Sequence, residues 1–189
     1  MTLWPFRRKA RSAADMLRGE RNCTACGAAH NGMFDLSPLS PDPWPHARDY
    51  EPNANLRLDG DFLSEDFCVM DGSTFFVRCV LPLPVHGMAH DFAFGCWGTL
   101  KRENFEHYVD NFDAATVPPE APYFSWLCNS LRPFDLTQPL ACELQPQEGR
   151  QRPALFVLNE EHPLAVAQRG GITPEEVMRY YELHGHGGT

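Results

Sequence analysis

Short apolar runs in the middle of the chain predict β-strands. Residues 67–70 and 74–81 are two such runs, and Asp71-Gly72 between them is typical of a hairpin turn. A third run follows at residues 92–97, where side chains two positions apart share one face of a strand. The three segments together predict an antiparallel meander.

The apolar pattern then changes to helical spacing. Residues 101–112 carry apolar side chains on one side and glutamates on the other, which predicts a helix lying on the sheet. Thr173 and Pro174, followed by two glutamates, are typical of the start of a last helix. Residues 123–127 are strongly aromatic and close to prolines, so we expect a buried helical turn there. The residues expected to form one core against the 101–112 helix are Phe75, Val77, Phe92, Phe94, Trp97 and Trp126.

A second hairpin is predicted at residues 140–144 and 154–158, which flank a polar loop. The fold class that follows is α+β, with an antiparallel sheet of about five strands and helices packed on it. Residues 38–52 hold five prolines, which prevent regular strand pairing and indicate an extended connector on the surface.

The length and charge of the chain suggest a three-part organisation. A chain of 189 residues, 43% of them hydrophobic, can close one sizeable core but not two. We expect a basic arm at residues 1–22, a Cys/His segment with its proline-rich connector at residues 23–52, and an α+β body at residues 53–189. The arm has six Lys or Arg against two acids, and the other residues have ten against 23, which gives the net charge of −9. Because an acidic body repels phosphate backbones, we do not expect nucleic acid to be the partner.

The apolar runs and the cysteines indicate where the protein resides. No run approaches the roughly 20 residues of a membrane-spanning helix, and no secretion signal follows the basic start. The chain has seven cysteines, an odd number. Five of them lie singly among apolar residues, namely Cys68, Cys79, Cys96, Cys128 and Cys142. We therefore expect reduced, buried thiols in a cytoplasmic protein that does not bind membranes.

The best chemical signal is Cys23-x2-Cys26-Gly27-x2-His30, here called the Cys/His knuckle. This spacing lets one zinc ion meet both sulfurs at about 2.3 Å and a histidine nitrogen at about 2.0–2.1 Å. A redox pair would follow a strand, and haem attachment would need histidine directly after Cys26, so both are disfavoured. Two solvent-facing free thiols are the alternative.

A structural zinc site needs a fourth ligand, and the sequence leaves its identity open. The candidates are His86, His90, His162, Cys68 and Asp66. His86 and His90 have the spacing of a helical metal pair, but the prolines before them indicate a loop.

Other candidate chemistry is weaker. Glu160 and Glu161 beside His162 would suit an acid/base pair in a cleft, but the end of a strand and a capped turn explain the same residues. No serine-nucleophile elbow, phosphate-binding glycine loop or dinucleotide fingerprint occurs. No catalytic residue is assigned.

Several short motifs, in this order along the chain, resemble a bacterial family known only as domain of unknown function 2199. The motifs are Cys23-Thr24-Ala25-Cys26-Gly27 with His30, Asp66-Phe67-Cys68-Val69-Met70-Asp71, Phe75-Phe76-Val77-Arg78, Gly95-Cys96-Trp97, Pro122-Tyr123-Phe124-Ser125-Trp126-Leu127 and Glu161-His162-Pro163-Leu164-Ala165. The resemblance implies one domain in a bacterial cytoplasm and no known activity. The basic arm and the His184-Gly185-His186 tail lie beyond it.

The function expected from these features is a non-catalytic, zinc-braced module. It would bind a protein or a small ligand through an acidic, aromatic-rich surface. The alternative is a metal-dependent hydrolase in which the knuckle metal keeps a position open for water and Glu161 or a nearby carboxylate acts as base. Nucleic-acid binding through the arm and the knuckle ranks last because of the acidic body.

Overall fold

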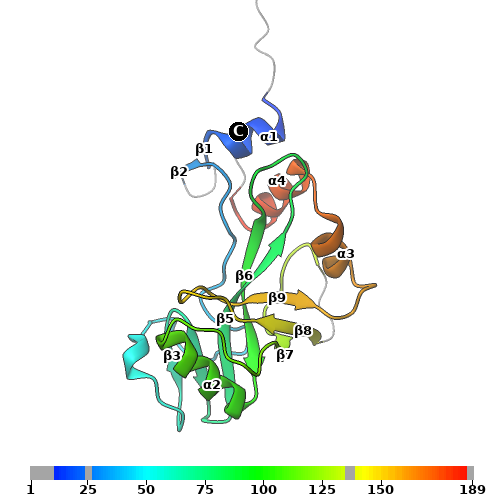
Figure 1. Ribbon diagram of the computed structural model, residues 1–189. Helices are drawn as coiled ribbons and strands as arrows, with labels where there is room; N and C mark the ends of the chain where they lie inside the picture. The colour runs from blue at the N-terminus through cyan, green and yellow to red at the C-terminus, as the bar shows by residue number, and fades with distance from the viewer. Residues whose placement is uncertain (1–10, 24–26, 135–138, 187–189) are drawn as a thin grey trace, which may run out of the picture.

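The computed structural model of the chain describes residues 11–23, 27–134 and 139–186 (Figure 1). Its helical elements are α1 (Ala13–Arg18), the short 3-10 helix η1 (Asn53–Asn55), α2 (Arg102–Asp113), α3 (Pro163–Gly170) and α4 (Pro174–Leu183). Its strands are β1 (Glu20–Asn22), β2 (Ala29–Asn31), β3 (Phe62–Leu63), β4 (Phe67–Met70), β5 (Thr74–Leu83), β6 (Phe92–Leu100), β7 (Tyr123–Leu127), β8 (Leu140–Gln145) and β9 (Ala154–Val157). None of the described helices combines the length and the apolarity that a membrane crossing requires.

The seven strands β3 to β9 form one sheet in sequence order, with each strand antiparallel to the next. The sheet closes on itself because β9 also pairs with β5, in parallel, at Val80 and Ala154. Residues 74–77, at the start of the long strand β5, pair with β4. β4 and β9 therefore lie along the same edge of β5, with β4 nearer its start and β9 further along. The expected α+β class is confirmed, but the sheet is a mixed, closed ring of five strands, β5 to β9, and not a simple antiparallel sheet.

The segment 123–127 is a strand and not the helical turn expected from its aromatic residues. Tyr123, Ser125 and Leu127 are buried while Phe124 and Trp126 are exposed, which is the period of two that a strand imposes. Each residue pairs with one in β8, from Tyr123 opposite Leu144 to Leu127 opposite Leu140. The aromatic content misled the prediction because the alternation, not the amount of apolar surface, decides the element.

The expected core forms in part. Phe75, Val77, Phe92 and Phe94 belong to the main cluster, against which Phe105 of α2 packs. Trp97 lies in a second cluster with Leu63, Cys68 and Phe76, and Trp126 is 42% exposed. Trp97 follows Cys96 directly, so the strand period turns its side chain to the outer face of the ring.

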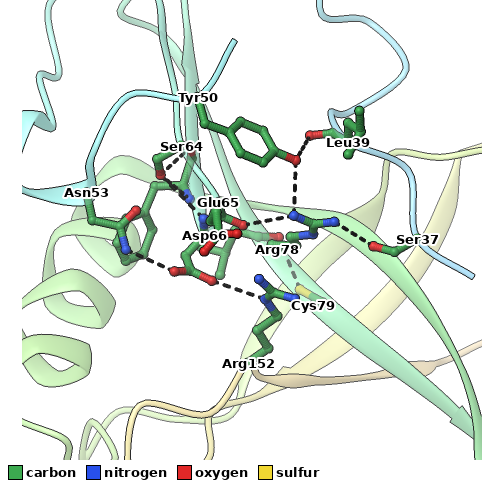
Figure 2. A network of polar contacts seen from close by, with 12 residues as sticks. Ser37, Leu39, Tyr50, Asn53, Ser64, Glu65, Asp66, Arg78, Cys79 and Arg152 are labelled. Atoms are coloured by element: carbon green, nitrogen blue, oxygen red, sulfur yellow. Dashed lines mark hydrogen bonds and ion pairs between the residues drawn. The ribbon is translucent and has the colours of Figure 1, made fainter. Parts of the chain in front are cut away.

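The proline-rich connector contains no helix or strand between residues 38 and 52, as predicted. Its Trp44 and Tyr50 pack on the second cluster and cover part of the outer face of the sheet. Buried Arg78 on β5 donates from Nη1 to the Tyr50 hydroxyl of the connector at 3.1 Å, and from Nη2 to Oγ of Ser37, the residue just before the connector, at 2.7 Å (Figure 2). The connector is therefore held onto the sheet by polar contacts as well as by apolar packing.

The helices at the two ends of the described chain lie together. The predicted last helix is α4, where Thr173 and Glu176 form a capping box and Pro174 occupies the first turn. Contacts between α1 and α4 bring the N-terminal hairpin β1–β2 close to the last turn of α4 (Figure 1). This packing creates the site described next.

Candidate metal centre

The first half of the site is a small hairpin. β1 and β2 pair so that Arg21 stands opposite His30. The Cys23 amide donates to the Ala28 carbonyl at 2.8 Å, and the Gly27 amide donates to the Cys23 carbonyl at 2.9 Å. Gly27 has φ +71°, a conformation that glycine adopts readily and that closes this turn. The turn therefore brings Cys23 and His30 to one end of the hairpin.

The second half comes from the end of the chain. After α4 the His186 amide donates to the Tyr181 carbonyl at 2.7 Å, and Gly185 has φ +77°. This tight turn folds the tail back over the last turn of α4. His186 is thus directed toward the hairpin that packs beside the same helix.

The ligand atoms of Cys23, His30 and His186 all lie within 4.8 Å of one another. Two ligands of a tetrahedral zinc ion, at about 2.0–2.3 Å from the metal, lie about 3.5 Å apart, so small side-chain shifts would let the three share an ion. One sulfur and two imidazole nitrogens suit zinc. Nδ1 of His186 is buried and has no hydrogen-bond partner among the described residues, so its lone pair can be offered to a metal ion. The residues present therefore fit a zinc ion.

An aromatic stack holds the histidines in place. The His30 ring lies on Phe34 with ring centroids 4.4 Å apart, and Phe34 lies on Tyr181 at 4.3 Å. His186 meets both His30 and Phe34 edge-on. The Tyr181 hydroxyl donates to the Phe34 carbonyl at 2.6 Å, and burial raises the pKa of Tyr181, so this contact persists at neutral pH.

Arg21 stands behind this stack. Its guanidinium carbon lies 5.1 Å from the centre of the Phe34 ring and 4.7 Å from that of Tyr181, and Nη1 donates to the Gly32 carbonyl at 2.7 Å. The side chain is 3% exposed, so its charge acts at low dielectric on the same face of the hairpin as His30.

The structure brings together two of the three ligands predicted from the knuckle, Cys23 and His30. The third, Cys26, lies outside the described residues. The fourth-ligand candidates that the structure describes have other contacts: Cys68 is in the second core cluster, Asp66 pairs with Arg152, His86 contacts the Gly170 carbonyl, and Nδ1 of His162 accepts the Leu164 amide. Exposed His90 stands beside a separate cavity.

Sequence reasoning missed His186, which joins the cluster instead of those candidates. The signal was present as the His184-x-His186 spacing directly after the last helix. His186 was not predicted as a metal ligand because 156 positions separate it from His30 in the sequence. The packing of α1 on α4 brings the two residues together.

A cavity opens beside the cluster. It has a volume of about 230 Å³ and is lined by Leu36, Ser37, Pro38, Phe94, Ser130, Leu131, His184 and His186. Its lining is mixed apolar and polar and contains no carboxylate. His186 belongs to both the cavity wall and the candidate metal cluster.

The glutamate–histidine motif forms a structural turn. His162 caps α3, and the Glu161 amide donates to Asn159 Oδ1 at 3.2 Å. The Glu161 side chain is exposed, and the start of α3 lies well away from the β1–β2 hairpin (Figure 1). Glu161 is therefore not placed to serve as a base at the cluster.

Comparison with known proteins gives one match. A family model described as "Uncharacterized protein conserved in bacteria (DUF2199)" matches residues 22–172. The matched segment contains Cys23 and His30 and ends before His186. No curated protein and no solved structure matches the chain.

Proposed function

This chain belongs to the uncharacterised bacterial family DUF2199, and we propose that it is a zinc-braced, non-catalytic binding module. The observation that carries the proposal is the convergence of Cys23, His30 and His186 within 4.8 Å. Cys26 remains a ligand predicted from the sequence, and with it the set would be two cysteines and two histidines. Such a closed set holds structure together and leaves no position for a substrate.

The ion would act as a brace between the two ends of the described chain. Cys23 and His30 belong to the N-terminal hairpin, whereas His186 follows the last helix. Structural zinc sites in small peptides contribute about 10–16 kcal/mol at neutral pH, more than the packing of a hairpin of two three-residue strands can supply. Zinc would therefore order the hairpin and the tail, while the closed sheet keeps its own core.

The metal-dependent hydrolase is the second candidate, and the cavity beside His186 favours it. A substrate could enter there, and a metal bound to only three protein ligands would keep a position for water. However, no carboxylate lines the cavity or joins the cluster among the described residues, so a general base is missing. The binding module is therefore the better-supported function.

Metal analysis tests the brace. Wild-type protein purified without chelator should contain one zinc per chain. Cys23→Ser and His186→Ala should bind zinc at least about 100-fold more weakly, because the loss even of a residue that only hydrogen-bonds to a metal ligand lowers metal affinity about 10–100-fold. Cys128→Ser and His90→Ala are matched controls outside the cluster and should keep the ion. Equal zinc in wild type and both cluster variants would refute the proposal, as would copper in place of zinc.

Turnover by the zinc-loaded protein distinguishes the two candidates. A panel of p-nitrophenyl esters and phosphates should give no hydrolysis above that of the His186→Ala variant. Zinc-dependent hydrolysis that Ser130→Ala or His184→Ala abolishes would assign the cavity to a hydrolase instead.

A further inference from the structure

The outer face of β7, β8 and β9 presents an apolar patch on the closed sheet. Register places Phe124 of β7 opposite Glu143 of β8, and Glu143 opposite Phe156 of β9. The adjacent row runs from Trp126 to Ala141 and on to Leu158, whose amide donates to the Ala141 carbonyl at 2.9 Å. Directly opposite residues share one face of a sheet, so these six side chains form a continuous surface, here called the outer patch.

The outer patch is exposed to an unusual degree. Phe124 is 52% exposed, Trp126 42% and Leu158 49%. The connector covers the outer face around Trp97 and Phe76, where Trp44 and Tyr50 pack. An apolar patch left uncovered next to a covered one marks an interaction surface.

The three strands of the outer patch and their ends carry acids but no basic residue of their own. Residues 120–131, 139–145 and 154–162, which contain the three strands and their ends, include four acids and no Lys or Arg. Basic side chains come from neighbouring elements: Arg169 of α3 donates to the Glu160 carbonyl at 2.6 Å, and exposed Lys101 follows β6, which pairs with β7. Glu143 stands between the two phenylalanines, accepts from Gln145 Nε2 at 2.6 Å, and forms no ion pair with a described residue. The patch therefore combines aromatic faces with a carboxylate that lacks a cationic partner in this part of the chain.

We propose that the outer patch binds an arginine-rich segment of another protein. A guanidinium group stacks on aromatic faces and pairs with a carboxylate in two parallel hydrogen bonds, and the patch offers both within one row of the sheet. Lysine suits this surface less well because its ammonium is a compact, strongly hydrated charge. The net charge of −9 adds long-range attraction for such a segment.

The inference names a partner class for the binding module proposed above, but it does not depend on zinc. The outer patch contains none of the three cluster residues. The peptide should therefore bind equally well before and after chelation of the metal. A failure at the patch would leave the zinc brace standing, and a protein without zinc could still bind the peptide.

The experiment titrates blocked arginine–glycine repeat peptides into the full-length protein, with lysine–glycine and glutamate–glycine peptides of equal length for comparison. Isothermal titration calorimetry measures binding in every variant, and in proteins that keep Trp126 its indole NH resonance reports whether the peptide lies at the outer patch. Trp126→Ala and Glu143→Gln should each weaken binding of the arginine peptide about three- to five-fold, the range expected for an exposed contact between a cation and an aromatic ring. The double variant should lose more affinity than either single variant.

The matched controls are Leu39→Ala and Glu175→Gln, which change an exposed leucine on the connector and an exposed acid on α4. Both should bind the peptide like wild type. Thermal unfolding of each variant confirms that it is folded.

Several results would overturn the inference. One is the absence of saturable binding, and another is equal affinity for the arginine and lysine peptides. A third is an equal loss of affinity in Glu143→Gln and Glu175→Gln, which would indicate unspecific charge attraction. Self-association that Trp126→Ala abolishes would assign the patch to a second copy of the chain. Tighter peptide binding after Arg7, Arg8 and Lys9 are replaced by serine would assign it to the basic arm.

Discussion

The sulfur atoms of this chain occupy two environments. Cys23 lies in the candidate metal cluster, whereas Cys68, Cys79, Cys96 and Cys142 are buried thiols of the body, and Cys128 is partly buried. Burial raises the pKa of Cys68, Cys128 and Cys142 to about 12 and also raises the pKa values of Cys79 and Cys96, which face each other across β5 and β6. All five are free thiols, and four of them are buried as the sequence predicted, whereas Cys128 is only partly buried.

These raised pKa values predict a loss of stability in alkaline solution. In the unfolded chain a thiol ionises near pH 9, but the folded chain keeps it protonated to higher pH. Between about pH 9 and 12 the folded state thus binds more protons, and the free energy of unfolding falls as pH rises. Urea unfolding at pH 8 and pH 10.5 should show this fall, and Cys96→Ala should make it shallower. A free energy of unfolding that rises over this interval would contradict the burial of the thiols.

At the scale of elements, Arg78 links the proline-rich connector to β5. Besides the contacts with Tyr50 and Ser37, its Nη1 donates to the Glu65 carbonyl at 3.3 Å (Figure 2). Its Nη2 donates to the Pro38 carbonyl, also at 3.3 Å. The side chain is 7% exposed, and no described carboxylate forms an ion pair with it. Neutral acceptors therefore hold a buried charge, and two of them, the Tyr50 hydroxyl and the Pro38 carbonyl, couple the connector to the sheet.

Replacing Arg78 by leucine should release the connector. The change removes hydrogen bonds from a charged donor, and we expect the free energy of unfolding to fall by about 2–3 kcal/mol. Trypsin should cut faster after exposed Arg48, which lies within the connector. Arg57→Leu is the control, because the ion pair of Arg57 with Glu51 is exposed and screened by solvent, so its loss should change stability and cleavage little. Unchanged cleavage in Arg78→Leu would mean that apolar packing alone holds the connector.

At the scale of the whole molecule, the chain has a closed sheet and a peripheral assembly of hairpin, α1, α4 and tail. The sheet contains most of the main core, whereas the hairpin consists of two three-residue strands. The two parts meet where Phe92 and Phe94 of β6 contact Tyr180 and Tyr181 of α4. Zinc in the candidate cluster would stabilise the peripheral assembly directly and the sheet only through this contact.

Removing the metal should therefore loosen the periphery without unfolding the sheet. After chelation, amide hydrogen exchange should accelerate in α1, β1, β2 and the last turn of α4, whereas β5 and β6 stay protected. His186→Ala should show the same pattern without chelator, and addition of zinc to the chelated wild type should reverse it. Cooperative unfolding of the whole chain on chelation, or exchange that does not change anywhere, would show that this division is wrong.

The sequence by itself determined the features that depend on neighbouring residues. The meander from β4 to β6 follows from a period of two and from the Asp71-Gly72 turn, and α4 follows from its capping residues. Cys23 and His30 converge because a short turn with Gly27 connects them. In each case the interactions that decide the conformation lie within a few positions along the chain.

The tertiary structure alone decided which surfaces meet. The ring closes through Val80 and Ala154, and the candidate cluster is completed by His186, which α1 and α4 bring to the hairpin. Trp97 and Trp126 both point outward, yet the connector covers only Trp97. A period of two assigns a side chain to one of two faces, but whether that face is buried depends on segments distant in sequence, whose approach is set by sheet twist and helix packing.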